Sequence, residues 1–293
     1  MTLLLEKKLV VIFIVFVSVF FNTANADNYI EGEKLYKSQN YQSALPLIET
    51  AAKNGNRKAQ YRLGVMYSHA YGVKENKEEA VKWYRKAAEQ GHVSAQYNLG
   101  VMYSKGEGVH QDDAKALYWM LKSAVQGDAY AQYNLGVMYS KGEGVHQNDA
   151  KALYWTLKSA AQGDADAQYH AGVLYTSGKG AKQSDKKASE WYEKAAMQGN
   201  ANAQFNLGYL YLNGKGVEKN AETAAAWYKK AALQRHADAQ AVLSELYRTG
   251  TGVPQDYREA FEWATGAKKR AARWGCICWD VCMITEKVSG KIP

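Results

Sequence analysis

The sequence predicts an all-α protein, a right-handed α-solenoid of stacked helix-turn-helix repeats. Three kinds of residue recur with a period of 36 residues over most of the chain: an Ala-Gln pair, a tryptophan and a glycine. Self-similarity over this distance is the signature of a repeat protein, in which each unit buries its apolar faces only by stacking on its neighbours. The series are Ala59, Ala95, Ala131, Ala167, Ala203 and Ala239; Trp83, Trp119, Trp155, Trp191, Trp227 and Trp263; and Gly72, Gly108, Gly144, Gly180, Gly216 and Gly252.

The N-terminal segment has the layout of a cleavable secretory signal. Lys7 and Lys8 precede an apolar run over residues 9–21, and Ala24 and Ala26 supply the small residues of a cleavage site. The run is short for a membrane span. We expect cleavage after Ala26, an exported protein that is periplasmic or secreted, and no stable membrane insertion after cleavage. The alternative is an uncleaved anchor.

The charge is mildly basic and evenly spread. The chain has 37 Lys and Arg residues and 29 Asp and Glu residues, which give a formal net charge of +8. No Lys/Arg block is present in the sequence. This composition allows attraction to anionic polymers of the cell envelope, but it does not indicate a nucleic-acid partner.

The first helix of each repeat, here called helix A, follows from the spacing of apolar residues. Ala95, Leu99, Met102 and Tyr103 recur at helical intervals and form one face. The glycine-rich stretch GEGV that follows predicts the end of the helix and a turn of the chain.

Four copies of helix A contain an interior glycine, namely Gly100, Gly136, Gly172 and Gly208. A mid-helix glycine costs about 1 kcal/mol relative to alanine. Because this cost is repeated, we expect a packing reason. The expected reason is close approach of the second helix, with the tryptophan series filling the space beside the glycine.

The second helix, helix B, begins after a residue suited to an N-cap, whose side chain accepts a bond from a free backbone N–H group. Ala116, Trp119 and Ala124 form its apolar face. The predicted caps of helix B are Asn76, Asp112, Asn148, Ser184, Asn220 and Asp256. Helix B is expected to end at Gly91, Gly127, Gly163 and Gly199, and Asp128, Asp164 and Asn200 are the expected caps of the next helix A.

These positions together resemble a known repeat family. The pattern A-Q-x-x-L-G-x-x-Y-x-x-G-x-G-V-x-x-[DN]-x-x-x-A-x-x-W is similar to that of Sel-one-like repeats, which are relatives of tetratricopeptide repeats, and it covers Ala59 to Trp263. The resemblance implies a non-enzymatic scaffold or adaptor that binds a protein or an extended peptide. Bacterial members act in the cell envelope or toward host proteins. We expect a monomer without a cofactor or a bound metal.

The predicted organisation has four parts. Residues 1–26 form the signal, and residues 27–58 form a tetratricopeptide-like capping repeat with Tyr41 and Leu47 in its core. Residues 59–266 form the array, and residues 267–293 form a degenerate tail. The repeats of the array are 59–94, 95–130, 131–166, 167–202, 203–238 and the partial repeat 239–266.

The resemblance also implies a binding groove along a concave face lined by helix A. An asparagine on successive layers can donate to and accept from the backbone of an extended peptide, and neighbouring aromatic rings can contact its side chains. Lys105 and Lys141 can attract acidic groups. The predicted groove residues are Tyr61, Arg62, Tyr97, Asn98, Lys105, Tyr133, Asn134, Lys141, Tyr169, His170, Phe205 and Asn206. The alternatives are solvated residues copied by duplication and a purely structural spacer.

An enzymatic alternative rests on Ser184 and Lys187, which match the S-x-x-K spacing of penicillin-recognising enzymes. Some cysteine-rich members of the family have been linked to β-lactam binding or hydrolysis, so a cell-wall or β-lactam hydrolase is the alternative function. The chain has no K-T-G or S-D-N element, and Ser184 occupies an N-cap position. We therefore favour capping. His110 and His146 share one loop position and are expected to be solvated.

The C-terminal segment contains the three cysteines of the chain, Cys276, Cys278 and Cys282. An exported protein with an odd number of cysteines can form a disulfide and keep a free thiol. A second interpretation is a one-base frameshift between Trp263 and Trp274, because reading across the codon junctions restores Leu-Gly in the 36-residue register. Sequencing of the gene distinguishes the two.

Overall fold

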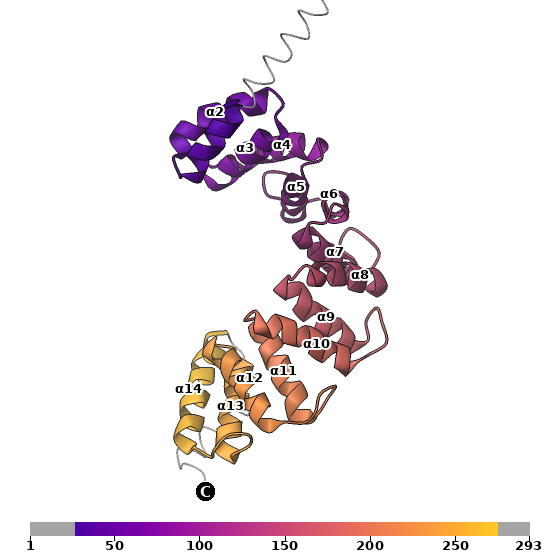
Figure 1. The fold of residues 1–293 in the computed structure, drawn as a ribbon, viewed down its shortest axis with the longest axis vertical. Coiled ribbons are helices and arrows are strands. Elements are labelled where there is room, and N and C mark those ends of the chain that lie inside the picture. Colours follow the sequence, from indigo (N-terminus) through magenta and orange to yellow (C-terminus); the bar gives the residue numbers. More distant parts are fainter. Residues whose placement is uncertain (1–26, 275–293) are drawn as a thin grey trace, which may run out of the picture. The chain divides into compact units, whose positions relative to one another are not determined.

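The computed structural model describes residues 27–274, with side chains placed for residues 27–266. Every regular element in this range is an α-helix, and the helices follow one another as tandem hairpins (Figure 1). The predicted all-α solenoid is therefore confirmed. The predicted signal and the cysteine-containing tail lie outside the described residues.

The described residues divide into two compact units, the first made of residues 27–132 and 143–146 and the second of residues 133–142 and 147–274. In the first unit, residues 27–37 are helical and are followed by α2 (Tyr41–Lys53), α3 (Arg57–His69), α4 (Lys77–Glu89), α5 (Val93–Lys105) and α6 (Asp113–Val125). Helix α7 (Ala129–Lys141) begins in the first unit and continues in the second. The second unit then contains α8 (Asp149–Ala161), α9 (Ala165–Ser177), α10 (Asp185–Met197), α11 (Ala201–Asn213), α12 (Ala221–Leu233), α13 (Ala237–Thr249) and α14 (Tyr257–Trp274).

Helices α3, α5, α7, α9, α11 and α13 are the copies of helix A, and each is followed by a helix B. Within each unit, the helices that pack extensively are consecutive along the chain. The predicted apolar faces form the core, since Ala95, Leu99 and Met102 of α5 and Ala116 and Trp119 of α6 are buried. Packing is therefore local in sequence, as expected for a repeat array.

The predicted N-caps of helix B are confirmed. Each side chain accepts a hydrogen bond from the backbone N–H three residues later, for example Asp112 from Lys115 and Asn220 from Thr223. The other caps are Asn76, Asn148, Ser184 and Asp256. The predicted helix-A caps Asp128, Asp164 and Asn200 act in the same way.

Close approach of helix B explains the interior glycines, but the residue beside them is different from the predicted one. A Cβ atom added at Gly172 would lie 2.5 Å from the ring of Tyr192, and one at Gly64 would lie 2.6 Å from the ring of Tyr84. These tyrosines come directly after the tryptophans. Met120, Thr156 and Tyr228 occupy the same position beside Gly100, Gly136 and Gly208.

The tryptophans instead lie at the outer edge of the core. Trp83 and Trp119 are 9% exposed and the later copies more so. A lysine three residues further along helix B covers several of these rings, and Lys194 Nζ lies 4.1 Å from the ring centroid of Trp191. The prediction that tryptophan fills the space beside the glycine was wrong, because the helical spacing turns the next residue toward helix A.

The buried glutamine of each Ala-Gln pair joins neighbouring helices. Gln204 Nε2 donates to the carbonyl of Ala196, and Gln204 Oε1 accepts from Gln234 Nε2 at 2.8 Å. The same two bonds are made by Gln60, Gln96 and Gln168. In Gln240 the bond to Ala232 is kept, but among the described residues its Oε1 has no partner.

The helical residues 27–37 and α2 have a core that differs in detail from the one predicted for an N-terminal capping repeat. Ile48, Ala51 and Ala52 on α2 are buried, whereas Tyr41 and Leu47 are half-buried. The core position predicted for Leu47 is therefore occupied by its neighbour Ile48, because a shift of one residue on a helix changes the direction of the side chain by about 100°.

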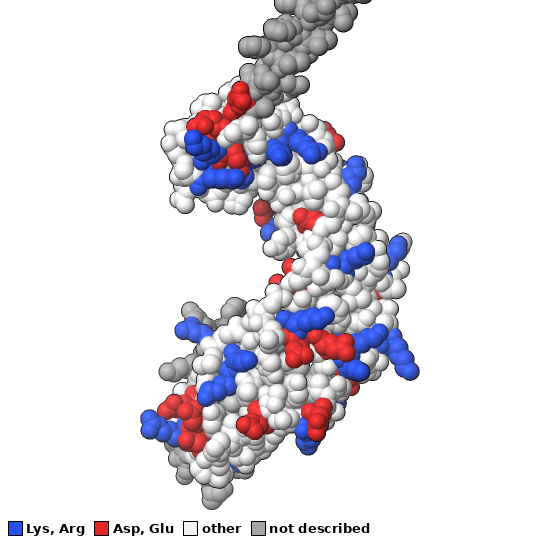
Figure 2. All heavy atoms as spheres, in the orientation of Figure 1, with Lys and Arg blue, Asp and Glu red and all other residues white. Residues whose placement is uncertain are grey.

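The surface carries charges of both signs. On the face shown in Figure 2, Lys and Arg are interspersed with Asp and Glu, without a large patch of one sign. Among the described helices, none has the length and apolar character that crossing a bilayer requires.

Candidate partner-binding surface

The predicted groove residues share two adjacent positions of helix A in five successive repeats. On α3, α5, α7, α9 and α11, the aromatic residue and the residue after it are half-buried. Lys105 and Lys141 lie at the ends of α5 and α7 and are exposed. The structure thus places the twelve predicted residues on equivalent parts of their helices, where their side chains are partly accessible.

The aromatic residues contact the first turn of the next helix A. Tyr61 stacks on His92 with ring centroids 4.4 Å apart, and Phe205 stacks on His236 at 4.9 Å. Tyr97 lies 6.1 Å from Tyr130. These rings therefore join repeats while leaving part of their surface exposed.

Two of the predicted asparagines lie near tyrosine hydroxyl groups. Burial raises the pKa of Tyr84 on α4, and the Asn98 side chain acts in the opposite direction. Burial likewise raises the pKa of Tyr169 on α9 and of Tyr192 on α10, and the Asn206 side chain opposes it in both. A carboxamide has two donors and two acceptor lone pairs, so each amide has the capacity to bond a phenol and a ligand together.

Arg62 occupies the position that asparagine takes in other repeats. Its positive charge is neutralised by a carboxylate within the chain. Its guanidinium donates two hydrogen bonds to Glu33, at 2.7 and 2.6 Å, and lies 4.1 Å from the ring centroid of Tyr36. Both partners belong to the helical residues 27–37. A bidentate pair of this kind holds the guanidinium in place, so Arg62 stabilises the N-terminal repeat.

His170 lies between two tyrosines of the second unit. Its ring meets Tyr133 edge-to-face at 5.2 Å and Tyr169 at 5.7 Å. Burial lowers the pKa of His170, and Lys141 acts in the same direction, whereas Asp166 opposes both. The imidazole is therefore neutral near pH 7 and can donate and accept hydrogen bonds.

His92 and His236 are helix caps that the sequence analysis did not predict. Each accepts a backbone N–H through Nδ1 and caps a helix A, where other repeats have Asp128, Asp164 or Asn200. The 36-residue register aligns all five positions, so the signal was present. It was missed because histidine is not among the usual N-cap residues.

The S-x-x-K element serves helix structure. Ser184 Oγ accepts the backbone N–H of Lys187 at 3.3 Å and caps α10. The ammonium group of Lys187 lies 5.2 Å from the ring centroid of Tyr175. Ser184 thus caps the helix, as predicted, and the side chain of Lys187 lies against an aromatic ring.

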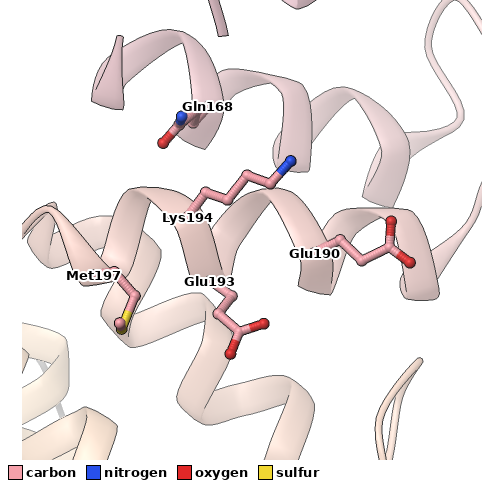
Figure 3. A pocket seen from close by; sticks show the side chains of 5 residues that line it. All are labelled: Gln168, Glu190, Glu193, Lys194 and Met197. Carbon is pink, nitrogen blue, oxygen red and sulfur yellow. The ribbon is translucent and has the colours of Figure 1, made fainter. Parts of the chain in front are cut away.

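An open depression lies on α10 beside α9. Glu190, Glu193, Lys194 and Met197 project from α10 and Gln168 from α9 (Figure 3). The four side chains from α10 are exposed, and exposed charges keep their hydration. The depression therefore does not provide the desolvated environment that tunes catalytic groups.

Among the described residues, no three side chains of the metal-binding types cluster at a spacing suited to a metal ion. His110 and His146 are exposed in the helix A–helix B loops, as predicted from their shared loop position.

Comparison with known proteins agrees with the repeat architecture. The Sel1 repeat model matches residues 57–92, 93–128, 129–164, 165–200, 201–236 and 237–267. A protective antigen present in uropathogenic Escherichia coli strains, which displays an SLR fold, is 39% identical with a TM-score of 0.76, over 78% of this chain and 49% of the antigen. The chain therefore spans about half of that antigen. A Sel1 repeat protein from Oxalobacter formigenes is 34% identical with a TM-score of 0.73, over 82% of this chain and 96% of that protein. A comparison with curated proteins finds no match.

Proposed function

Because the chain belongs to the Sel1 repeat family, we propose that it is an exported scaffold or adaptor that binds a protein or an extended peptide along its helix-A face. The helix-A face is defined here as the aromatic residue and the following residue on α3, α5, α7, α9 and α11. One observation supports this function best. The same two positions in successive repeats present half-buried rings and polar groups at regular intervals, which is suited to a ligand that is itself periodic.

The chemistry of this face supports an extended ligand. A peptide in extended conformation exposes backbone N–H and C=O groups along its length, and carboxamides such as Asn98 and Asn206 can bond both.

Export is part of the same proposal. The basic residues, the apolar run and the small residues at the N-terminus support it. The Escherichia coli relative is a protective antigen, and this accords with a chain that acts outside the cytoplasm. A fusion of residues 1–26 to alkaline phosphatase is expected to be active, because the enzyme requires export; an inactive fusion would argue against export.

The binding function is tested by crosslinking and pull-down from the native organism. We expect the combined substitutions Asn98→Ala and Asn134→Ala to reduce recovery of the partner, because two amides of the helix-A face are lost. Tyr118→Ala is the matched control, since Tyr118 is 50% exposed on helix B of the same region. Circular dichroism checks that each variant is folded. Equal recovery with the wild type and the folded asparagine variant would contradict the proposal.

A further inference from the structure

The first turns of helix A carry different charges in the two units. In the second unit, the second residue of helix A is Asp166 on α9, Asn202 on α11 and Asp238 on α13, and all three are exposed. In the first unit, the same position is Lys58 on α3, Ser94 on α5 and Tyr130 on α7. The aromatic rings described above lie next to these positions, so the local charge decides which ligand they favour.

Asp166 lies beside a pair of rings. Tyr133 and His170 meet edge-to-face with centroids 5.2 Å apart, and Asp166 precedes His170 by one helical turn. Asn200 Nδ2 donates to Asp166 Oδ1 at 3.0 Å, which orients the carboxylate. Burial raises the pKa of Tyr133 to about 12, and the negative charge of Asp166 acts in the same direction.

Asp238 has the same kind of surroundings two repeats later. Phe205 stacks on His236 with centroids 4.9 Å apart and an interplanar angle of 15°. His236 Nε2 lies 3.1 Å from Asn202 Oδ1. Asp238 follows His236 by two residues and acts electrostatically on its imidazole. A carboxylate next to an aromatic face is the combination that attracts a guanidinium or an ammonium group.

Both imidazoles are neutral near pH 7. Burial lowers the pKa of His236, opposed by Asp238, and burial and Lys141 lower that of His170, opposed by Asp166. His236 also accepts the N–H of Ala239 through Nδ1, which requires the neutral ring. Neither histidine therefore competes with a cationic ligand for the neighbouring carboxylate.

The first unit has a similar ring pair without the carboxylate. Tyr61 stacks on His92 with centroids 4.4 Å apart and an interplanar angle of 18°. Lys58 and Ser94 flank this stack where the second unit has an asparagine and an aspartate. Lys58 repels a cation. The stack of Tyr61 on His92 is therefore a control within the same chain, with nearly the same rings as the second unit but a positive charge in place of a negative one.

We propose that the first turns of α9 and α13, together with the adjoining helix-A-face rings of Tyr133 and Phe205, bind the arginine or lysine side chains of an extended basic peptide. Asp166 and Asp238 each neutralise one cation beside an aromatic ring. This assignment rests on the proposed function, because it names the chemical class of the partner for the same face. The whole chain has a formal net charge of +8. Non-specific attraction would therefore favour an acidic peptide and does not mimic the proposed preference.

Fluorescence anisotropy with designed peptides tests the proposal. The probe is a fluorescein-labelled Gly-Ser peptide that contains arginines, and its counterpart contains glutamates in the same places. We expect the wild type to favour the arginine peptide. The combined substitutions Asp166→Asn and Asp238→Asn are expected to weaken its binding about tenfold, since each lost ion pair costs severalfold in affinity.

Matched variants separate this effect from stability and net charge. Asparagine occurs naturally at this position as Asn202, so the substitutions preserve the helix, and a thermal melt checks the fold. Asp149→Asn makes the same charge change in the first turn of helix B and is expected to bind as the wild type does. The reciprocal pair Lys58→Asn and Ser94→Asp is expected to increase binding, because it gives the first unit the charges of the second.

Each outcome decides between the two proposals. Equal or tighter binding of the glutamate peptide, or unchanged arginine-peptide binding in the folded Asp166 and Asp238 variant, overturns the basic-peptide assignment. Suppose that the variant with Asn98→Ala and Asn134→Ala loses the natural partner in the pull-down, while the variant with Asp166→Asn and Asp238→Asn binds the partner and the arginine peptide as the wild type does. The scaffold function then stands and this assignment fails. If neither set of variants changes binding, both proposals fail.

Discussion

Histidine takes the N-cap position of helix A in two repeats in which others have aspartate or asparagine. His92 and His236 accept the backbone N–H groups of Ala95 and Ala239 through Nδ1, at 3.3 and 3.2 Å. In His236 the proton is therefore on Nε2, which donates to Asn202 Oδ1. Protonation of Nδ1 removes the acceptor, so each cap exists only while the ring is neutral.

These two caps predict a loss of stability in acid. Burial lowers the pKa of His92 and of His236 below the unfolded value of about 6.5. The unfolded state then binds more protons, so the stabilisation is complete above pH about 6.5 and is lost as the pH falls from there through the folded-state pKa. We expect the combined substitutions His92→Asn and His236→Asn to reduce this loss, by about 1 kcal/mol for each cap.

Urea unfolding at neutral and mildly acidic pH measures this difference. His146→Asn is the control, because His146 is exposed in a loop. An unchanged acid-induced loss in the double variant would show that the caps do not titrate as described.

Ala70 is a residue in an unfavourable conformation. It caps α3 with φ 58° and ψ 34°, where the equivalent residues of the later repeats are glycines with positive φ. The left-handed region costs an L-residue about 1–2 kcal/mol. We expect Ala70→Gly to raise the free energy of unfolding by about 0.5–1 kcal/mol in urea titrations, partly offset by the greater freedom of glycine in the unfolded chain. A decrease would contradict this explanation, and Gly106→Ala should have the opposite effect.

At the scale of elements, the loop between helix A and helix B contains two glycines with different functions. Gly178 and Gly180 have φ of 69° and 78°. A Cβ at Gly178 would lie 3.4 Å from the side chain of Gln183, which is an ordinary contact, whereas one at Gly180 would overlap the carbonyl of Asp149 on α8. Gly178 is needed for conformation alone. Gly180 also allows the loop to pack on the preceding helix B.

This difference predicts unequal costs for the same substitution. Gly178→Ala is expected to lower the free energy of unfolding by about 1 kcal/mol, the cost of the left-handed conformation. Gly180→Ala is expected to cost about 3 kcal/mol or more, because the backbone of α8 must also move. Chemical denaturation of the two variants compares them directly, and equal costs would exclude the packing function of Gly180.

At the scale of the whole molecule, stability is expected to be a sum of local terms. Extensive packing joins consecutive helices, and the glutamine and aromatic contacts link each repeat to the next. In such a quasi-one-dimensional array, each repeat depends mainly on its nearest neighbours. A local defect should therefore open a local region without unfolding every repeat.

Gly172→Ala provides the corresponding test. The added Cβ meets the ring of Tyr192, so α9 and α10 must separate. We expect faster hydrogen–deuterium exchange in α9, α10 and the adjacent helices, with little change in α3 to α5. Mass spectrometry of the exchanged peptides measures this. Uniformly faster exchange over the described helices would show global cooperativity instead.

The sequence predicted the helices well because their signals are local. The caps Asp112 and Ser184 and the loop glycine Gly178 each act within a few residues, and the period repeats them. The candidate surface was less predictable. The pairing of Arg62 with Glu33 spans 29 residues, and no local pattern indicates which acid will meet which base across such a distance.

Periodic local chemistry therefore accounts for the all-α solenoid, its repeat length and its N-caps, since each depends on the residue types within one turn or loop. Three-dimensional packing accounts for the contacts between helices. It selects Tyr192 rather than Trp191 to fill the space beside Gly172, uses Arg62 to secure the N-terminal repeat, and brings Asp166 to the rings of Tyr133 and His170. These outcomes depend on distances between residues on different helices, which the order of residues does not express.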